Sequence, residues 1–259
     1  MGIEVFRKHL REKRAIKVVS DIDNYNIENV AKICRAAQKA KASAVDVACS
    51  KEVFLTAKKN TKLPIFVSSI HPFELLKAVQ WGADAIEIGG FSSLYKNGKS
   101  FSMEEAYNIV LETLSLINKY EVYTCATIPG NIDIKDQIEL TKRFEVLGID
   151  LVQTESIKEV SNGKNSTQLI NSIEAGIKNT SELFENTAMP IMTNTGLDSK
   201  FTASAFSAGA NAVSIDIPTN NLTTEVEMCA KIMSIVSSVS YRNSINKEIR
   251  LAKQELASI

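Results

Sequence analysis

The sequence repeats one short segment four times, as Ala44-Val45-Asp46-Val47-Ala48, Ala85-Ile86-Glu87-Ile88-Gly89, Leu151-Val152-Gln153-Thr154-Glu155 and Ala212-Val213-Ser214-Ile215-Asp216. Each segment is typical of a buried strand with a polar residue at its centre. The last three follow a turn that contains a glycine, where the preceding helix is expected to end. They alternate with four other apolar segments. Eight strand–helix units predict a closed parallel (β/α)8 barrel, the TIM barrel of the α/β class.

The whole chain, residues 1–259, is predicted to form one such domain, with a short N-terminal helix and an extra C-terminal helix. The other strands are expected at residues 15–20, 63–68, 122–128 and 190–193. Helices are expected at residues 27–41, 52–59, 72–80, 135–147, 167–184 and 201–208, with two more starting at the capping sequences Ser102–Glu105 and Thr224–Glu227. The extra helix, residues 242–257, has an apolar stripe that either covers the barrel or makes a homo-oligomer contact: Ile245, Ile249, Ala252 and Leu256.

The overall composition excludes several classes of partner. Thirty basic residues balance thirty acidic ones, which argues against nucleic acid or an anionic membrane as the main partner. No apolar run reaches the roughly 18 residues of a membrane helix, and no targeting peptide is visible at the N-terminus. The four cysteines lie far apart and form no paired motif, which predicts reduced thiols and neither disulfides nor a zinc site.

Strand alternation predicts a polar layer inside the barrel. In the repeated segments the apolar second residues are expected to face the helices, so that four polar residues point inward: Asp46, Glu87, Gln153 and Ser214. These residues come from alternate strands, and one layer of a barrel is built in this way. An apolar layer is the usual filling, so the polar one indicates either a site or a buried ion-pair network that only holds the barrel together.

The same alternation turns Lys17 inward and puts Glu155 and Asp216 at the mouth of the barrel. We expect Lys17, Asp46, Glu87 and Glu155 to be the catalytic residues. Lys17 would act as an electrophile or a charge clamp, and a carboxylate would carry a proton. A divalent ion among the acids is the less favoured alternative, because Lys17 would compete for them, and no metal is predicted.

The turn Asn194-Thr195-Gly196 follows strand seven, where many barrels bind a phosphate. The partner turn after strand eight lacks a glycine, and its Asp216 would repel an anion. Only one of the two turns that form a phosphate site in such barrels therefore has a suitable sequence. His71, after strand three, is an acid or base candidate near neutral pH. The expected ligand-binding residues are therefore these: His71, Gln153, Asn194, Thr195, Gly196 and Asp216.

Two long loops, residues 90–99 and 156–166, belong to the same face as these turns. The second loop is polar and contains a glycine. A mobile lid over the site and an ordinary solvated loop both fit this composition.

Four stretches carry a resemblance to a known family: Ala15–Ser20 followed by Asn24, Glu87–Gly89, Gln153–Glu155 and Thr195–Leu197. Across essentially its whole length the chain resembles the hypothetical chloroplast reading frame 23 proteins, which algal plastid genomes and cyanobacteria encode. The resemblance implies an aldolase-type, phosphate-binding-like barrel in the plastid, that is, the chloroplast stroma. Without it, the cysteines indicate only a reducing, cytosol-like compartment. The family has no established reaction, so the resemblance supplies the fold and the location.

Two functions from different classes remain open. The first is an enzyme of the lyase or isomerase type that acts on a small anionic metabolite, with or without a phosphate group, and the polar layer below the open end of the barrel favours it. The second is a ligand-sensing or regulatory barrel without chemistry, which the incomplete phosphate turn favours. Binding of flavin mononucleotide suffers from the same incomplete turn, so no cofactor is predicted.

Overall fold

The computed structural model describes residues 2–95, 98–155, 166–195, 199–217 and 222–257. Eight parallel strands form a closed barrel in which each strand pairs with its neighbours in the sequence and the last pairs with the first. The strands are β1 (Ala15–Val19), β2 (Ala44–Ala48), β3 (Ile65–Ser69), β4 (Ala85–Ile88), β5 (Tyr123–Ile128), β6 (Leu151–Thr154), β7 (Ile191–Asn194) and β8 (Ala212–Asp216). The predicted (β/α)8 barrel is confirmed, and the two strands at residues 44–48 and 212–216 have the predicted bounds.

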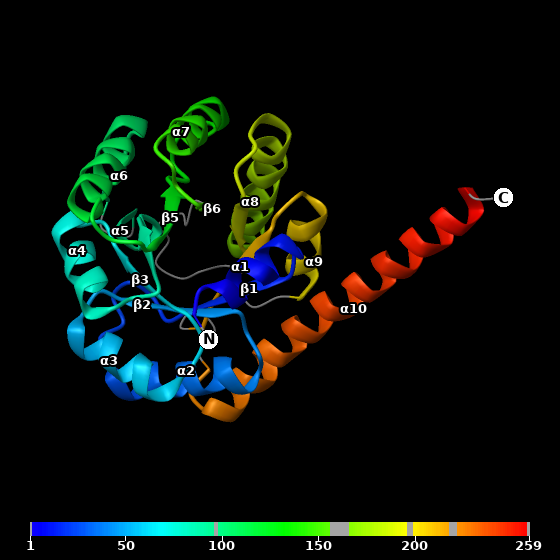
Figure 1. Ribbon diagram of the computed structural model, residues 1–259, viewed down its shortest axis with the longest axis horizontal. Helices are drawn as coiled ribbons and strands as arrows, with labels where there is room; N and C mark the ends of the chain where they lie inside the picture. Colours follow the sequence, from blue (N-terminus) through cyan, green and yellow to red (C-terminus); the bar gives the residue numbers. More distant parts are fainter. Residues whose placement is uncertain (1, 96–97, 156–165, 196–198, 218–221, 258–259) are drawn as a thin grey trace.

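The helices surround the barrel (Figure 1). They are α1 (Glu4–Arg11), α2 (Ile27–Lys39), α3 (Lys51–Asn60), α4 (Pro72–Trp81), α5 (Ser92–Tyr95), α6 (Met103–Ile117), α7 (Ile134–Val146), α8 (Ser166–Asn186), α9 (Ser199–Ser207) and α10 (Glu225–Ala257). Ser102 and Glu105 form the expected capping box at the start of α6, where each side chain bonds the other residue's backbone N–H. The short helix α5 lies within the loop of residues 90–99 and was not predicted.

The C-terminal region differs from the prediction, because α10 is one continuous helix of 33 residues where the pattern predicts two helices. Neither glycine nor proline occurs between Glu225 and Ala257, so no residue there interrupts the helix. The first half of α10 packs against α2 and α9. Figure 1 shows its second half projecting away from the barrel. Tyr241 and Ile249 on this second half are exposed.

The barrel interior is apolar at its amino-terminal end. The Phe6 ring of α1 packs edge-on against Phe66 and Tyr123, with ring centroids 5.1 and 5.9 Å apart, and Leu10 belongs to the same buried cluster. A second apolar core lies between the strands and the outer helices, and it contains the four residues predicted to face outward: Val45, Ile86, Val152 and Val213. Because α1 closes the lower end, a site inside the barrel can open only at the carboxyl ends of the strands.

The strand register places the polar residues above this plug. Lys17 lies opposite Ala44, two residues before Asp46, and Ser68 lies opposite Glu87. The stagger between neighbouring strands therefore puts Lys17 one layer deeper than the two carboxylates. All four residues of the predicted polar layer are buried, which agrees with their inward direction: Asp46, Glu87, Gln153 and Ser214.

Candidate active site at the carboxyl end of the barrel

A buried ion pair joins three strands inside the barrel. Lys17 of β1 is completely buried, and its Nζ donates to Asp46 Oδ2 of β2 at 2.6 Å and to Glu87 Oε2 of β4. The Phe66 ring lies 5.2 Å from the same ammonium. Burial alone would lower the pKa of Lys17, but the carboxylates of Asp46 and Glu87 outweigh it and raise that pKa above its usual value. Lys17 is therefore a permanent positive charge.

Side chains from three further strands, β3, β5 and β6, complete the hydrogen bonding of the carboxylates. Ser68 Oγ donates to Asp46 Oδ1 at 2.5 Å. Thr127 Oγ1 and Gln153 Nε2 donate to Glu87 Oε1 at 2.9 and 2.7 Å. Neither Ser68 nor Thr127 is among the site residues that the sequence predicts. Extending the inward alternation to β3 and β5 would have found both residues, because their strands flank β4.

Glu87 is a carboxyl group in this cluster whose affinity for a proton is raised. One ammonium faces two carboxylates, so the pair of acids carries one more charge than Lys17 neutralises. Burial raises the pKa of Glu87, although Lys17 acts in the opposite direction. Burial likewise raises the pKa of the Cys125 thiol, which lies beside Glu87 and stays protonated. An acid whose pKa is raised above its ordinary value is suited to general acid–base chemistry near neutral pH.

A small cavity of about 40 Å³ opens above the ion pair at the carboxyl ends of the strands. It is lined by Val19, Asp21, Ile22, Asp46, Ser68, Glu87, Gly90, Gln153, Glu155, Asn194 and Asp216. Metabolite pockets are usually several hundred Å³ in volume. The cavity bounded by the described residues therefore has space for one end of a metabolite.

Three of the predicted residues lie at the rim of this cavity. Glu155 is buried and accepts a hydrogen bond from Tyr95 Oη of α5 at 3.3 Å. Asn194 Nδ2 donates to Asp216 Oδ2 at 2.9 Å, which links β7 to β8. The unpredicted helix α5 thus contributes a phenol to the site. Burial and the Glu155 carboxylate raise the pKa of Tyr95, so the phenol remains a donor.

Two predicted ligand-binding residues do not reach the cavity. His71 is exposed at the N-terminal cap of α4 and is not among the residues that line it. Thr195 is fully buried, and its Oγ1 lies 3.3 Å from Thr202 Oγ1 of α9, so it faces the helix layer. Gly196, residues 218–221 of the partner turn and residues 156–165 of the predicted lid lie outside the described residues.

The part of the chain that the structure describes contains no group of three or more His, Cys, Asp or Glu side chains arranged to hold a metal ion. The four cysteines are free thiols. Within the same ranges, no helix is long and apolar enough to cross a membrane.

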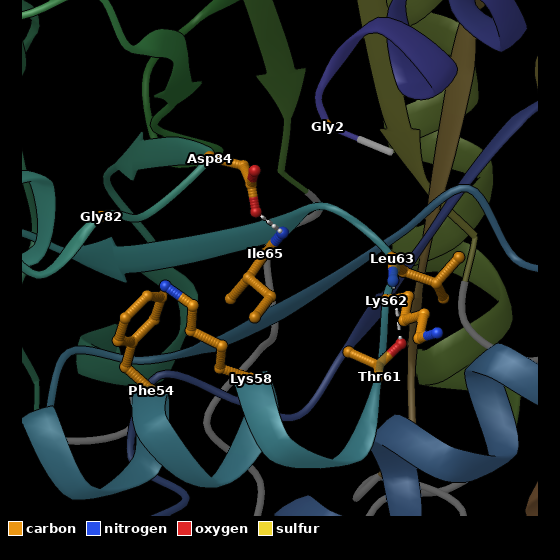
Figure 2. A pocket seen from close by; sticks show the side chains of 9 residues that line it. All are labelled: Gly2, Phe54, Lys58, Thr61, Lys62, Leu63, Ile65, Gly82 and Asp84. Carbon is orange, nitrogen blue, oxygen red and sulfur yellow. Dashed lines mark hydrogen bonds between the residues drawn. The ribbon is translucent and has the colours of Figure 1, made fainter.

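A second hollow, of about 510 Å³, lies at the opposite, amino-terminal end of the barrel (Figure 2). Figure 2 shows Phe54 and Lys58 of α3 on one side of it and Asp84 on the other. Asp84 Oδ2 accepts a hydrogen bond from the backbone N–H of Ile65 at 3.0 Å, and Lys58 Nζ lies 5.5 Å from the Phe54 ring. None of the predicted site residues lines this hollow, so it is separate from the candidate active site.

Comparison with known sequences identifies relatives along most of the chain. The family described as "Protein of unknown function (DUF561)" matches residues 4–245. The "Uncharacterized protein ycf23" of Cyanidium caldarium is 35% identical over 232 residues, which cover 89% of this chain and 90% of the relative. The protein of the same name from Cyanophora paradoxa is 31% identical over 233 residues, covering 90% and 95%.

Solved structures with the same fold include enzymes of several kinds. (S)-3-O-geranylgeranylglyceryl phosphate synthase from Thermoplasma acidophilum, in complex with its substrate sn-glycerol-1-phosphate, gives a TM-score of 0.62 at 16% identity, covering 91% of this chain and 98% of that one. N-acetylmannosamine-6-phosphate 2-epimerase from Clostridium perfringens gives 0.56 at 16% identity, covering 87% and 95%. The YdjI aldolase from Escherichia coli gives 0.53 at 13% identity, covering 93% and 92%. At these identities the likeness shows the fold alone.

Proposed function

The chain belongs to the DUF561 family, whose function is unknown, and from its site we propose that it is an enzyme of the lyase or isomerase type that acts on a small anionic, phosphorylated metabolite. The observation that carries this proposal is Glu87 at the cavity, with a raised pKa and fixed donors on both carboxylate oxygens. Lyases and isomerases of this kind need a base that removes a proton from carbon and an acid that returns one.

In the proposed reaction Glu87 accepts a proton from a substrate carbon next to a carbonyl group, and the electron pair moves onto the carbonyl oxygen. Lys17 acts as a fixed charge below Glu87, which offsets the negative charge of the cluster as the proton moves. A Schiff base at Lys17 is disfavoured, because a nucleophilic lysine has to be neutral and reachable, whereas Lys17 is buried with a raised pKa. Of the two roles expected for Lys17, the charge clamp is the one supported.

The comparisons support the substrate class and the location of this protein. The synthase binds sn-glycerol-1-phosphate and the epimerase is named for a sugar phosphate, so barrels of this shape accept phosphorylated substrates. The relatives are ycf23 proteins of algae, which plastid genomes encode, and this supports the expected plastid location.

A deuterium-exchange experiment tests the proposal. The protein is incubated in heavy water with a panel of phosphorylated hydroxy-carbonyl metabolites, chosen beforehand by thermal shift, and deuterium on carbon is followed by NMR. We expect exchange with the wild type and none with Glu87→Gln, which keeps the shape of the side chain. The Glu87→Gln variant should stay folded, because the amide keeps the shape of the side chain and is cheaper to bury than a carboxylate, which offsets the hydrogen bond lost where its NH2 group replaces an accepting oxygen. Undiminished exchange in Glu87→Gln would refute the role of Glu87.

A matched control is Glu28→Gln. Glu28 also pairs with a lysine, Lys32, at 2.9 Å, but its side chain is 79% exposed on α2. This variant should keep the exchange rate and melting temperature of the wild type.

A second candidate function is a regulatory barrel that binds a ligand without turnover. It is favoured by the internal hydrogen bonding of the site, since Lys17, Ser68, Thr127 and Gln153 already donate to Asp46 and Glu87. Such a network is also what a merely structural ion-pair cluster would form. A ligand that raises the melting temperature of the wild type and of Glu87→Gln equally, without exchange in either, would favour this second function.

A further inference from the structure

One buried acceptor at the cavity has no hydrogen-bond partner within the part of the chain that the structure describes. Gln153 is 6% exposed, and its Nε2 is committed to Glu87 Oε1 at 2.7 Å. That bond fixes the orientation of the amide, because turning it over would point two oxygens at each other. Gln153 Oε1 then has no hydrogen-bond partner among the described residues. A buried acceptor left in this state destabilises the protein, and a bound group that donates to it would remove that cost.

The charge at the inner end of the cavity limits what that group can be. Asp46 and Glu87 line the cavity, whereas Lys17 lies beneath them and is completely buried. A ligand that enters the cavity therefore meets the two carboxylates before it meets the ammonium. A phosphate or carboxylate placed there would be repelled at short range and in a medium of low dielectric constant.

A neutral hydroxyl group satisfies both conditions. It can donate to Gln153 Oε1, and it carries no charge for the acids to repel. An ammonium group would also donate, but burying it removes the hydration of a full charge and of three N–H groups, whereas a hydroxyl group needs a single acceptor. The cavity of about 40 Å³ has space for one carbon with its hydroxyl group.

We propose that the substrate is a polyhydroxylated phosphate ester that enters the cavity with its hydroxyl-bearing end, which donates to Gln153 Oε1, and keeps its phosphate outside. This inference rests on the proposed function in one respect: it assumes that the part of the substrate inside the cavity is the part that reacts. It deepens that proposal by assigning the orientation of the substrate and by making Gln153 the residue that selects it.

Three probes of similar size test the inference by calorimetry on the full chain. Glycerol 3-phosphate, 3-phosphoglycerate and 3-amino-2-hydroxypropyl phosphate share one phosphate end and differ at the other end, which is a hydroxymethyl, carboxylate or ammoniomethyl group. We expect the hydroxyl probe to bind most tightly, by about ten- to a hundredfold over the carboxylate. Gln153→Met, which keeps the length of the side chain and removes the acceptor, should reduce this preference to about threefold or less.

The matched control is Gln137→Met. Gln137 is also buried, but it lies on α7 outside the barrel and bonds the backbone carbonyl of Ile132. This variant should keep the preference of the wild type. Should Gln153→Met fail to fold, the ranking of the three probes on the wild type still decides the matter.

Equal binding of the three probes, preference for a charged end, or no binding at all would overturn the inference. None of these results affects the exchange experiment with Glu87→Gln, which tests proton transfer independently. Preference for the hydroxyl end without deuterium exchange would support the assigned orientation and refute the catalytic proposal.

Discussion

Replacing Lys17 by methionine should reveal how much the buried ion pair contributes to stability. The ammonium is completely buried between Asp46 and Glu87, whose side chains are each 3% exposed. The substitution leaves two buried carboxylates without their common partner. Removing one partner of such a pair typically costs about 3–5 kcal/mol. At about 2–4 °C per kcal/mol for a chain of roughly this size, the melting temperature should fall by about 6–20 °C.

The stability lost in Lys17→Met should depend on pH, and the buried carboxylates of the site determine the direction of this dependence. Burial already raises the pKa of Glu87, and Lys17 is the main group that lowers it, so the substitution raises this pKa further. An acid whose pKa is higher in the folded state stabilises the protein below its unfolded pKa, and this stability is lost as the pH rises through the folded pKa. The deficit of Lys17→Met should therefore be smallest near pH 5 and largest near pH 8. Melting curves at pH 5, 6, 7 and 8 measure it.

Lys39→Met is the matched control. Lys39 Nζ pairs with Glu225 at 2.6 Å, the same distance as Lys17 with Asp46, but the Lys39 side chain is 64% exposed. An exposed pair contributes less than about 1 kcal/mol, so this variant should melt close to the wild type at every pH. Adding Glu87→Gln to Lys17→Met removes the surplus carboxylate and should recover part of the loss. A Lys17→Met variant that melts like the wild type at pH 8 would refute the account of the ion pair.

Three further predictions concern the surroundings of the site. Gly89→Ala should lower the melting temperature and weaken ligand binding in calorimetry, because Gly89 has φ +141° and the new Cβ would collide with the Thr127 side chain. Its control is Gly148→Ala, where φ is +80° and the new Cβ would have nothing within 4 Å; this variant should leave binding unchanged. Phe6→Ala should cost about 3–5 kcal/mol in urea denaturation, whereas a loss under about 1 kcal/mol would contradict the role of α1 as a plug. The deuterium-exchange rate should rise with pH through the raised pKa of Glu87, and a rate that falls over the same range would exclude Glu87 as the base.

The sequence alone determined the fold and the centre of the candidate site. Each repeated segment alternates with a period of two, and in a closed barrel that period decides which side chains face inward. Lys17, Asp46 and Glu87 were therefore predicted to converge, and the structure places them in one ion-paired cluster. The predicted role of these residues in chemistry stays a prediction.

The predicted turns and helices were less reliable. The pattern indicated two helices where α10 is one, because an apolar stripe does not reveal where a helix ends when no glycine or proline marks it. His71 and Thr195 follow strands at the correct face, yet one is exposed and the other turns toward α9. Residues in turns have no fixed period, so their direction could not be predicted from their position in the chain.

Only the tertiary structure decided which atoms meet inside the barrel. The period of a strand assigns a side chain to a face, but its partner depends on the stagger between strands, which closure of the whole barrel sets. That stagger brings Ser68 to Asp46 and Thr127 to Glu87, and it leaves Gln153 Oε1 at the cavity without a partner among the described residues. The sequence thus determined the residues that line the site, whereas the three-dimensional register decided their hydrogen bonds and the proton affinity of Glu87.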